Sequence, residues 1–154
     1  MLFLAEPSVA YRDSFIQAVR EFQAEGRQQH YDLKSLSGDF GAFVQALHDQ
    51  KDRSKLKPGW VPASDFWLID GGEFVGRLSV RHELNEQLLL FGGHIGYEIR
   101  PSKRKQGYGK EILRLGLEKA RELGLHRVLV TCDEDALEIE GEPVRKLRYW
   151  IDIQ

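Results

Sequence analysis

The residue types that could do chemistry are concentrated in one loop. It reads Arg100-Pro-Ser-Lys-Arg-Lys-Gln-Gly-Tyr-Gly109 and contains the pattern R-x-x-G-x-G between residues 104 and 109. The first turn of a helix has N–H groups without partners, and the helix dipole adds partial positive charge there. Glycines at positions 107 and 109 let the backbone approach an anion with no Cβ in the way. We therefore expect this loop to bind a pyrophosphate group.

Basic side chains should add positive potential around the same loop, at Arg100, Lys103, Arg104 and Lys105. The pattern is neither the dinucleotide fingerprint G-x-G-x-x-G nor the triphosphate-binding G-x-x-x-x-G-K-[ST]. Taken alone, six such residues are equally typical of a solvated connection between a strand and a helix. The elements on either side of the loop therefore decide the interpretation.

Those flanking elements are a strand and an amphipathic helix. Ile95, Tyr97 and Ile99 alternate with more polar residues, which predicts a strand that ends at Pro101. Residues 107–123 carry one apolar stripe with arginine and glutamate opposite, and Gly124 is a helix stop. The β-branched run 127–132 is typical of a buried strand.

The rest of the chain predicts further helices and strands around this unit. Helical spacing covers residues 9–24 and about 39–49, while 28–38 and 84–90 remain ambiguous. Strands are expected at 2–5, 66–69, 74–80, 136–139 and 144–153, with turns at 70–72 and 140–143. This order predicts a single α+β (mixed α/β) domain over residues 1–154, with a mostly antiparallel sheet flanked by helices.

The segment from Gly93 to Leu113 resembles the acetyl-CoA-binding core of the GNAT superfamily of N-acetyltransferases. That family's phosphate loop is written Q/R-x-x-G-x-G/A, and a strand ending in a residue–Pro step precedes it. Residues 127–132 resemble the next family strand, which splays from its neighbour to admit the cofactor. The order of elements matches over nearly the whole chain, so the resemblance implies acetyl-CoA as donor and an amine as acceptor. The contacts it implies for acetyl-CoA are Tyr97, Ile99, Arg100, Arg104, Lys105, Gln106, Gly107, Tyr108, Gly109 and Lys110.

One segment departs from the family pattern. The family has another helix after the strand that ends near Cys132, but here residues 133–139 run almost directly into the last hairpin. Either that helix is deleted, or the sequence omits residues that the molecule contains. The family often takes cofactor contacts and a general-acid tyrosine from this helix, so both contributions are open here.

In the family, the acceptor amine attacks the thioester directly. An amine of pKa about 10.4 needs a base or a water chain at neutral pH. His94 is our first candidate for this base, since histidine titrates near ~6.5, and Glu98 on the same strand face is the second. Tyr149 is a candidate acid. Each candidate also has a plainer interpretation. His94 would be a hydrogen-bonded histidine at a strand edge, Glu98 a surface carboxylate, and Tyr149 an aromatic that packs beside Trp150.

Composition limits the other functions. With 154 residues, 42% of them hydrophobic, the chain has enough apolar material for one packed core. A net charge of −2 gives no general argument for nucleic acid, although binding through residues 100–105 is a weaker alternative. The single cysteine, Cys132, is expected in the core, and no metal site is expected. No apolar run approaches the roughly 20 residues of a membrane span.

We therefore expect a cytoplasmic N-acetyltransferase that acts on a small-molecule or peptide amine, without nucleic acid or membrane as partner. The main alternative is a protein of the same fold that binds acetyl-CoA without turnover. A homodimer through the exposed edge of the terminal hairpin is a further expectation. The identity of the acceptor cannot be read from the sequence, because fold does not determine substrate.

Overall fold

The protein is built on one six-stranded sheet whose strands follow the chain order β1-β2-β3-β4-β5-β6. The computed structural model describes residues 1–132 and 147–153. Every neighbouring pair of strands is antiparallel except β4 and β5, which are parallel. The strands are β1 (Leu2–Ala5), β2 (Ala63–Asp70), β3 (Glu73–Arg81), β4 (Ile95–Ile99), β5 (Arg127–Cys132) and β6 (Leu147–Asp152). The predicted α+β class with a mostly antiparallel sheet is confirmed.

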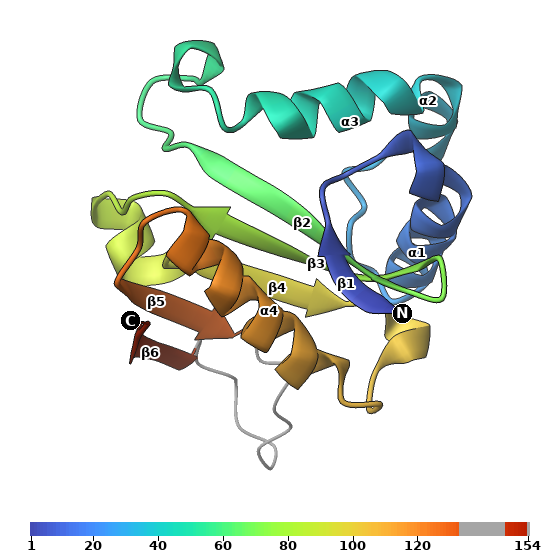
Figure 1. Cartoon of the computed structure of the whole chain (residues 1–154). Coiled ribbons are helices and arrows are strands. Elements are labelled where there is room, and N and C mark those ends of the chain that lie inside the picture. The colour runs from blue at the N-terminus through green and yellow to red at the C-terminus, as the bar shows by residue number, and fades with distance from the viewer. Residues whose placement is uncertain (133–146, 154) are drawn as a thin grey trace.

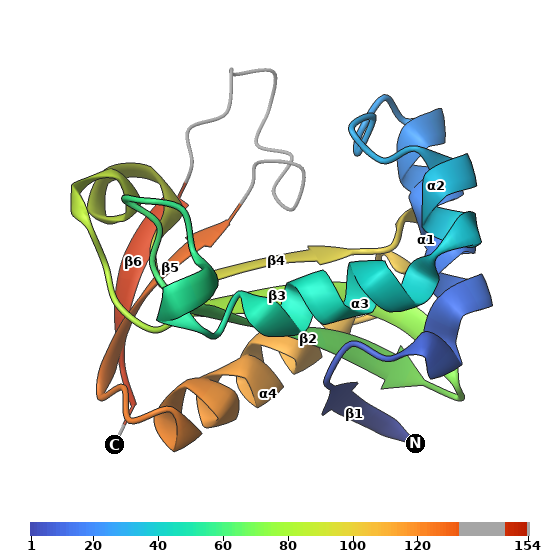
Figure 2. The same cartoon turned by 90° about the horizontal axis from the view of Figure 1, so that it is seen from above.

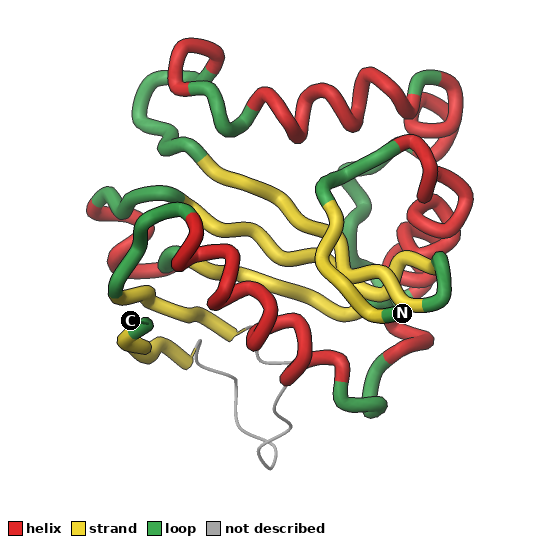
Figure 3. The backbone as a smooth tube through the Cα atoms, in the orientation of Figure 1, coloured by secondary structure: helices red, strands yellow, loops and turns green. Residues whose placement is uncertain are grey.

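Helices cover both faces of this sheet (Figures 1 and 3). They are α1 (Arg12–Ala24), α2 (Leu33–Gly38), α3 (Phe40–Asp49) and α4 (Tyr108–Glu122). The first three pack on one face, which we call the α1 face, and α4 packs on the other. None of the helices in the described ranges is long and apolar enough to cross a membrane.

Helix α4 lies very close to the sheet because a glycine stands where it crosses β3. A Cβ added at Gly116 would lie 2.3 Å from Cδ1 of Leu78, which is fully buried. Ile112 and Ala120, one turn to either side, are also fully buried. The apolar stripe read from the sequence is thus the face that packs on the strands.

An aromatic cluster holds α1 on the sheet. The ring of Phe15 stacks on Trp67 of β2 with 4.6 Å between centroids, and Phe74 of β3 meets it edge-on at 5.0 Å. Aromatic pairs of this kind add to the free energy gained from burial alone. The position of α1 relative to β2 and β3 is therefore well determined, which matters because α1 also contacts the loop after β4.

The elements differ from the sequence prediction in the ambiguous segments. Helix α2 falls in the polar stretch 28–38, and its signal was the N-cap Asp32, whose carboxylate accepts the Lys34 N–H at 3.2 Å. Residues Leu88–Gly92 form one π-helical turn. Strand β6 begins at residue 147, and the predicted strand 136–139, the turn 140–143 and the question of the missing family helix lie outside the described residues.

The parallel pair β4–β5 is the irregular part of the sheet. These strands match in register at Ile95 and Val130, whereas β3 and β4 match at five successive positions. Beyond residue 95 the two strands run apart, and Figure 2 shows β5 and β6 at an angle to β4. The sheet therefore opens at its middle, toward the end where α4 begins.

Candidate active site

The opening between β4 and β5 exposes one backbone edge of β4. The N–H of Arg81 donates to the His94 carbonyl at 2.7 Å, and the N–H of Arg100 donates to the Val75 carbonyl at 2.8 Å. Because hydrogen-bonded pairs alternate along an antiparallel ladder, the N–H groups of Gly96 and Glu98 point to β3. The N–H groups of the residues between and after them, Tyr97 and Ile99, therefore point toward the opening.

The loop after β4 leads into the first turn of α4. The N-cap, Gly107, has φ +88°, a conformation that favours glycine, and no side chain caps this helix end. The first intrahelical bond runs from the Glu111 N–H to the Gly107 carbonyl at 3.4 Å. The N–H groups of Tyr108, Gly109 and Lys110 precede it and have no acceptor in the described part of the chain.

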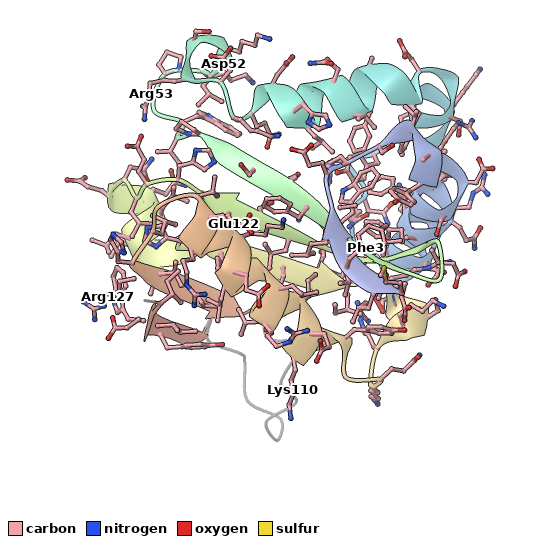
Figure 4. All side chains as sticks on the ribbon, in the orientation of Figure 1. Phe3, Asp52, Arg53, Lys110, Glu122 and Arg127 are labelled. Carbon is pink, nitrogen blue, oxygen red and sulfur yellow. The ribbon has the colours of Figure 1, made fainter. Side chains whose placement is uncertain are left out.

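Space is available at this helix end. A Cβ built on Gly107 or on Gly109 would meet no heavy atom within 4 Å. Lys110 projects from the first turn of α4 into solvent (Figure 4). Unpaired donors, open space and the positive end of a helix dipole together suit an anion.

Most of the basic side chains of the loop are paired with acids of α1 and β3. Arg100 is buried, and its Nε and Nη2 contact the Glu21 carboxylate at 2.7 and 2.6 Å. Arg104 pairs with Glu25, and Lys103 pairs with Glu73 at 2.9 Å. Much of the positive potential expected from the sequence is thus neutralised within the protein. Lys105 and Lys110 form no ion pair within the described ranges.

Two more residues that were expected to contact acetyl-CoA, Tyr108 and Gln106, have side chains that bond within the protein instead. The Tyr108 hydroxyl donates to Asp70 at 2.6 Å, which ties the first turn of α4 to the end of β2 and raises the pKa of Tyr108. Nε2 of Gln106 donates to the Ser102 carbonyl at 3.3 Å. The backbone of residues 105–110 is therefore better suited than the side chains to contact a phosphate.

His94 lies where β4 and β5 meet before they part. Its N–H donates to the Leu129 carbonyl at 2.8 Å, and its Nδ1 accepts the Leu129 N–H at 2.9 Å. The side chain is buried, and burial together with the charge of Arg81 lowers its pKa. Because Nδ1 is used as an acceptor, the neutral ring carries its proton on Nε2. This arrangement leaves no ring lone pair to take a proton from an amine.

Glu98 lies four residues further along the same face, about 13 Å away at ~3.3 Å per residue. Its carboxylate accepts Nε2 of Gln28 at 2.7 Å and lies 3.4 Å from Nη2 of both Arg27 and Arg77. The side chain is 15% exposed and borders a small cleft between α1 and the sheet. A carboxylate has room for about four donors, so Glu98 can accept another.

Tyr149 is placed away from both candidates for the base. It pairs with Val130, whose side chain is in the core beneath α4, so Tyr149 faces the α4 side of the sheet. The ring is 39% exposed. The structure brings His94 and Glu98 to one face but does not bring Tyr149 to them. The side chain of Cys132 lies outside what the structure describes.

No group of three or more His, Cys, Asp or Glu side chains within residues 1–132 and 147–153 is arranged to hold a metal ion. The chain matches the acetyltransferase (GNAT) domain family over residues 15–137, which is most of its length. The chain belongs to the GNAT acetyltransferase family. No curated protein matches it.

Solved structures show the same fold for this GNAT chain at low sequence identity. RimJ of Mycobacterium smegmatis, in complex with a CoA disulfide, is 19% identical with a TM-score of 0.53, and the match covers 84% of this chain. RimL, a ribosomal L7/L12 α-N-protein acetyltransferase in complex with CoA, is 18% identical with a TM-score of 0.57 over 84% of this chain. The match spans 65% of the RimJ chain and 70% of the RimL chain.

Sequence reasoning missed part of the polar face of this GNAT domain. Arg77, Ser79 and Arg81 alternate along β3 and point to the α1 face, beside Glu98 of β4. The sequence does indicate this face, because polar residues at every second position of an otherwise apolar strand lie on the same side of the sheet. Gln28 and Arg27 carried no such signal, because they come from the loop after α1.

The bond between His94 and Leu129 predicts a pH dependence of stability for this GNAT chain. The pKa of His94 is lower in the folded chain than in the unfolded one, so the unfolded chain binds the proton first as pH falls. Neutral His94 therefore contributes fully to the free energy of unfolding above the pKa of the unfolded chain, about 6.5. This contribution is lost as the pH falls from there toward the lower pKa of the folded chain. The free energy of unfolding, measured with urea, should therefore fall less between pH 7.5 and pH 5.5 in His94→Gln than in the parent.

His30→Gln is the control, since His30 is an exposed histidine between α1 and α2. His82 is retained in both variants, because burial and the charge of Lys51 also lower its pKa. Equal pH dependence in His94→Gln and the parent would show that the Nδ1 bond to Leu129 does not hold the ring neutral.

Proposed function

We propose that this GNAT chain transfers an acetyl group from acetyl-CoA to the amine of a small molecule or a peptide. The observation that carries the proposal is the separation of β4 from β5 beside the uncapped start of α4. A slot between strands that ends at a helix N-terminus suits a long, flexible donor with a pyrophosphate at one end. The CoA held by RimJ and by RimL gives independent support for this donor.

The donor would lie with its pyrophosphate against the N–H groups of residues 105–110. Its thioester would lie along β4, where the N–H groups of Tyr97 and Ile99 face the opening. Backbone donors aimed at a carbonyl oxygen stabilise the negative charge that forms there during attack. The loop of residues 100–104, held by Glu21, Glu25 and Glu73, keeps the α4 N-terminus in place for this contact.

The amine nitrogen would attack the thioester carbonyl carbon directly, and the C–S bond would break to release CoA as a thiolate. A thiol titrates near ~8.5, so the thiolate leaves and takes a proton from water without a strong acid. For the proton of the amine we propose Glu98 as acceptor in place of His94. The reason is that Nδ1 of His94 is occupied by Leu129, whereas the Glu98 carboxylate is 15% exposed and accepts fewer hydrogen bonds than its two oxygens allow.

Glu98→Gln should lower turnover by about 10²–10⁴-fold, the usual effect of removing a general base. Acetyl-CoA affinity should change little, because Gln keeps the size of the side chain and the proposed contacts of the donor are backbone N–H groups of β4 and of residues 105–110. Thiol release from acetyl-CoA across a panel of amines measures turnover.

Glu83→Gln is the matched control, since Glu83 is an exposed carboxylate that pairs with Arg53. His94→Gln should be less affected in turnover than Glu98→Gln. If Glu98→Gln and His94→Gln both stay within several-fold of the parent at high pH, proton transfer runs through water and catalysis rests on positioning and carbonyl polarisation. Binding of acetyl-CoA without thiol release for any amine would instead favour a binding protein.

A further inference from the structure

The guanidinium of Arg81 lies on the α1 face beside the point where β4 and β5 begin to part. Arg81 is the last residue of β3, and its N–H bonds to His94, directly before β4. A Cβ added at Gly92 or at Gly96 would come within 3.6 or 3.9 Å of its Nη1. The guanidinium therefore rests over glycine backbone, between the Leu88–Gly92 turn and the first residues of β4.

Only one nitrogen of this guanidinium is used within the described residues. Nη1 donates to the carbonyls of Gly92 at 3.0 Å and Gly93 at 3.2 Å. The Nε and Nη2 edge makes no hydrogen bond in residues 1–132 and 147–153. That edge is the planar fork that binds a carboxylate through two parallel hydrogen bonds. Two backbone carbonyls hold the group in place, so little entropy is lost when the fork is filled.

Arg81 also forms no ion pair within the described residues. Asp65 is the carboxylate whose charge acts on it, but Asp65 accepts the Ser79 hydroxyl, and Glu98 contacts Gln28, Arg27 and Arg77. Burial and the like charge of Arg77 lower the pKa of Arg81, and the charge of Asp65 offsets only part of this lowering. A half-buried charge without a partner is unfavourable, and an anionic ligand would remove that penalty.

We infer that the acceptor carries a carboxylate close to the amine that is acetylated, and that Arg81 binds this carboxylate through its Nε and Nη2. Free amino acids and peptides with an acidic second residue have this chemistry. The inference rests on the proposed function, since it places the acceptor amine on the face that Glu98 and Arg81 share. It adds a specificity-determining residue that does not take part in the chemical step.

The test compares matched acceptors with and without the carboxylate. The pairs are L-alanine against L-alaninamide, and Ala-Asp-Ala-amide against Ala-Asn-Ala-amide, with thiol release measured at saturating acetyl-CoA. In Arg81→Met the ratio of kcat/KM for the charged over the neutral acceptor should fall by about 10–100-fold, mainly through KM. In Arg81→Lys this ratio should lie between those of the parent and Arg81→Met, because lysine keeps the charge but lacks the two parallel N–H donors.

Arg53, which is labelled in Figure 4, supplies the control. Arg53→Met removes a positive charge from an exposed ion pair with Glu83 and should leave the ratio unchanged. Thermal unfolding and acetyl-CoA affinity of each variant report whether the Leu88–Gly92 turn still folds. An unchanged ratio in Arg81→Met overturns the inference. An equal loss for charged and neutral acceptors also overturns it, because Arg81 would then act on the transition state rather than on a carboxylate.

A separate binding measurement distinguishes failure of the inference from failure of the proposed function. If no amine supports thiol release, the acetyltransferase proposal itself fails. Calorimetric titration of N-acetyl-L-alanine and N-acetyl-L-alaninamide into the CoA-loaded parent and Arg81→Met still tests the carboxylate site. Preference of the parent for the charged ligand, lost in the variant, supports the site, and equal binding overturns it.

Discussion

Gly109→Val should weaken acetyl-CoA binding by about 100-fold or more while the domain stays folded. Gly109 has ordinary helical φ, and a Cβ there would meet nothing within 4 Å, so the free protein should accept the side chain. In the complex the same side chain would occupy the space of the pyrophosphate. Losing two charge-assisted hydrogen bonds at about 1.5 kcal/mol each gives this factor. Isothermal titration calorimetry measures the dissociation constant.

Gly38→Val in α2 is the matched control, because Gly38 also has ordinary φ and open space but lies away from the loop. Gly107→Val should also lose binding, but φ +88° makes valine strained there whatever binds. Gly109→Val is therefore the more informative variant, because a loss of binding there comes from the blocked anion site and not from a strained loop. Parent-like affinity in a folded Gly109→Val would place the donor elsewhere.

Arg100→Met should lower the free energy of unfolding by about 3–5 kcal/mol, the usual effect of leaving one partner of a buried ion pair alone. Arg100 contacts Glu21, the Phe74 carbonyl and the Ser14 hydroxyl. Burial raises the pKa of Glu21, but hydrogen bonds from Arg100 and Ser102 outweigh it and hold that pKa below its usual value. At about 2–4 °C per kcal/mol, the melting temperature should fall by roughly 6–20 °C.

The double variant Arg100→Met/Glu21→Leu should recover part of this loss, because it removes the unpaired carboxylate as well. Lys103→Met is the surface control and should change stability by less than about 1 kcal/mol, since its partner Glu73 is exposed. If Arg100→Met instead keeps its stability but binds acetyl-CoA weakly, Arg100 contacts the phosphates, as the family resemblance implies.

The elements around the loop could be predicted because their signals are local. Helix α4 was expected at 107–123 and is Tyr108–Glu122, and β5 was expected at 127–132 and is Arg127–Cys132. Helix α4 has a regular apolar stripe that stops at Gly124, and β5 is a continuous apolar run, so the neighbours of each along the chain determine it. Helix α2 escaped prediction because it has one apolar turn, and a single turn has no period to detect.

The partners of the site residues could not be predicted, because they are distant along the chain. Glu21 and Glu25 stand 79 residues before Arg100 and Arg104, and they meet only because the aromatic cluster seats α1 beside the loop. Leu129 follows His94 by 35 residues. Residue type alone made His94 a good base and Arg104 a good phosphate ligand. Only the packing of α1 and β5 reveals which of their atoms are already in use.

If acetyl-CoA binds as proposed, the short contact between β4 and β5 should make the stability of the protein depend on this donor. Strands β1–β4 and the β5–β6 pair are joined in the sheet by the register match of Ile95 with Val130 and by the two bonds between His94 and Leu129. A donor bound in the slot, as proposed above, would contact both parts and take the place of the missing hydrogen bonds between β4 and β5. A ligand that binds only the folded state at 100 times its Kd stabilises it by about 2.7 kcal/mol. The lifetime of the folded protein would then follow the acetyl-CoA supply of its surroundings, and starvation for the donor would shorten it.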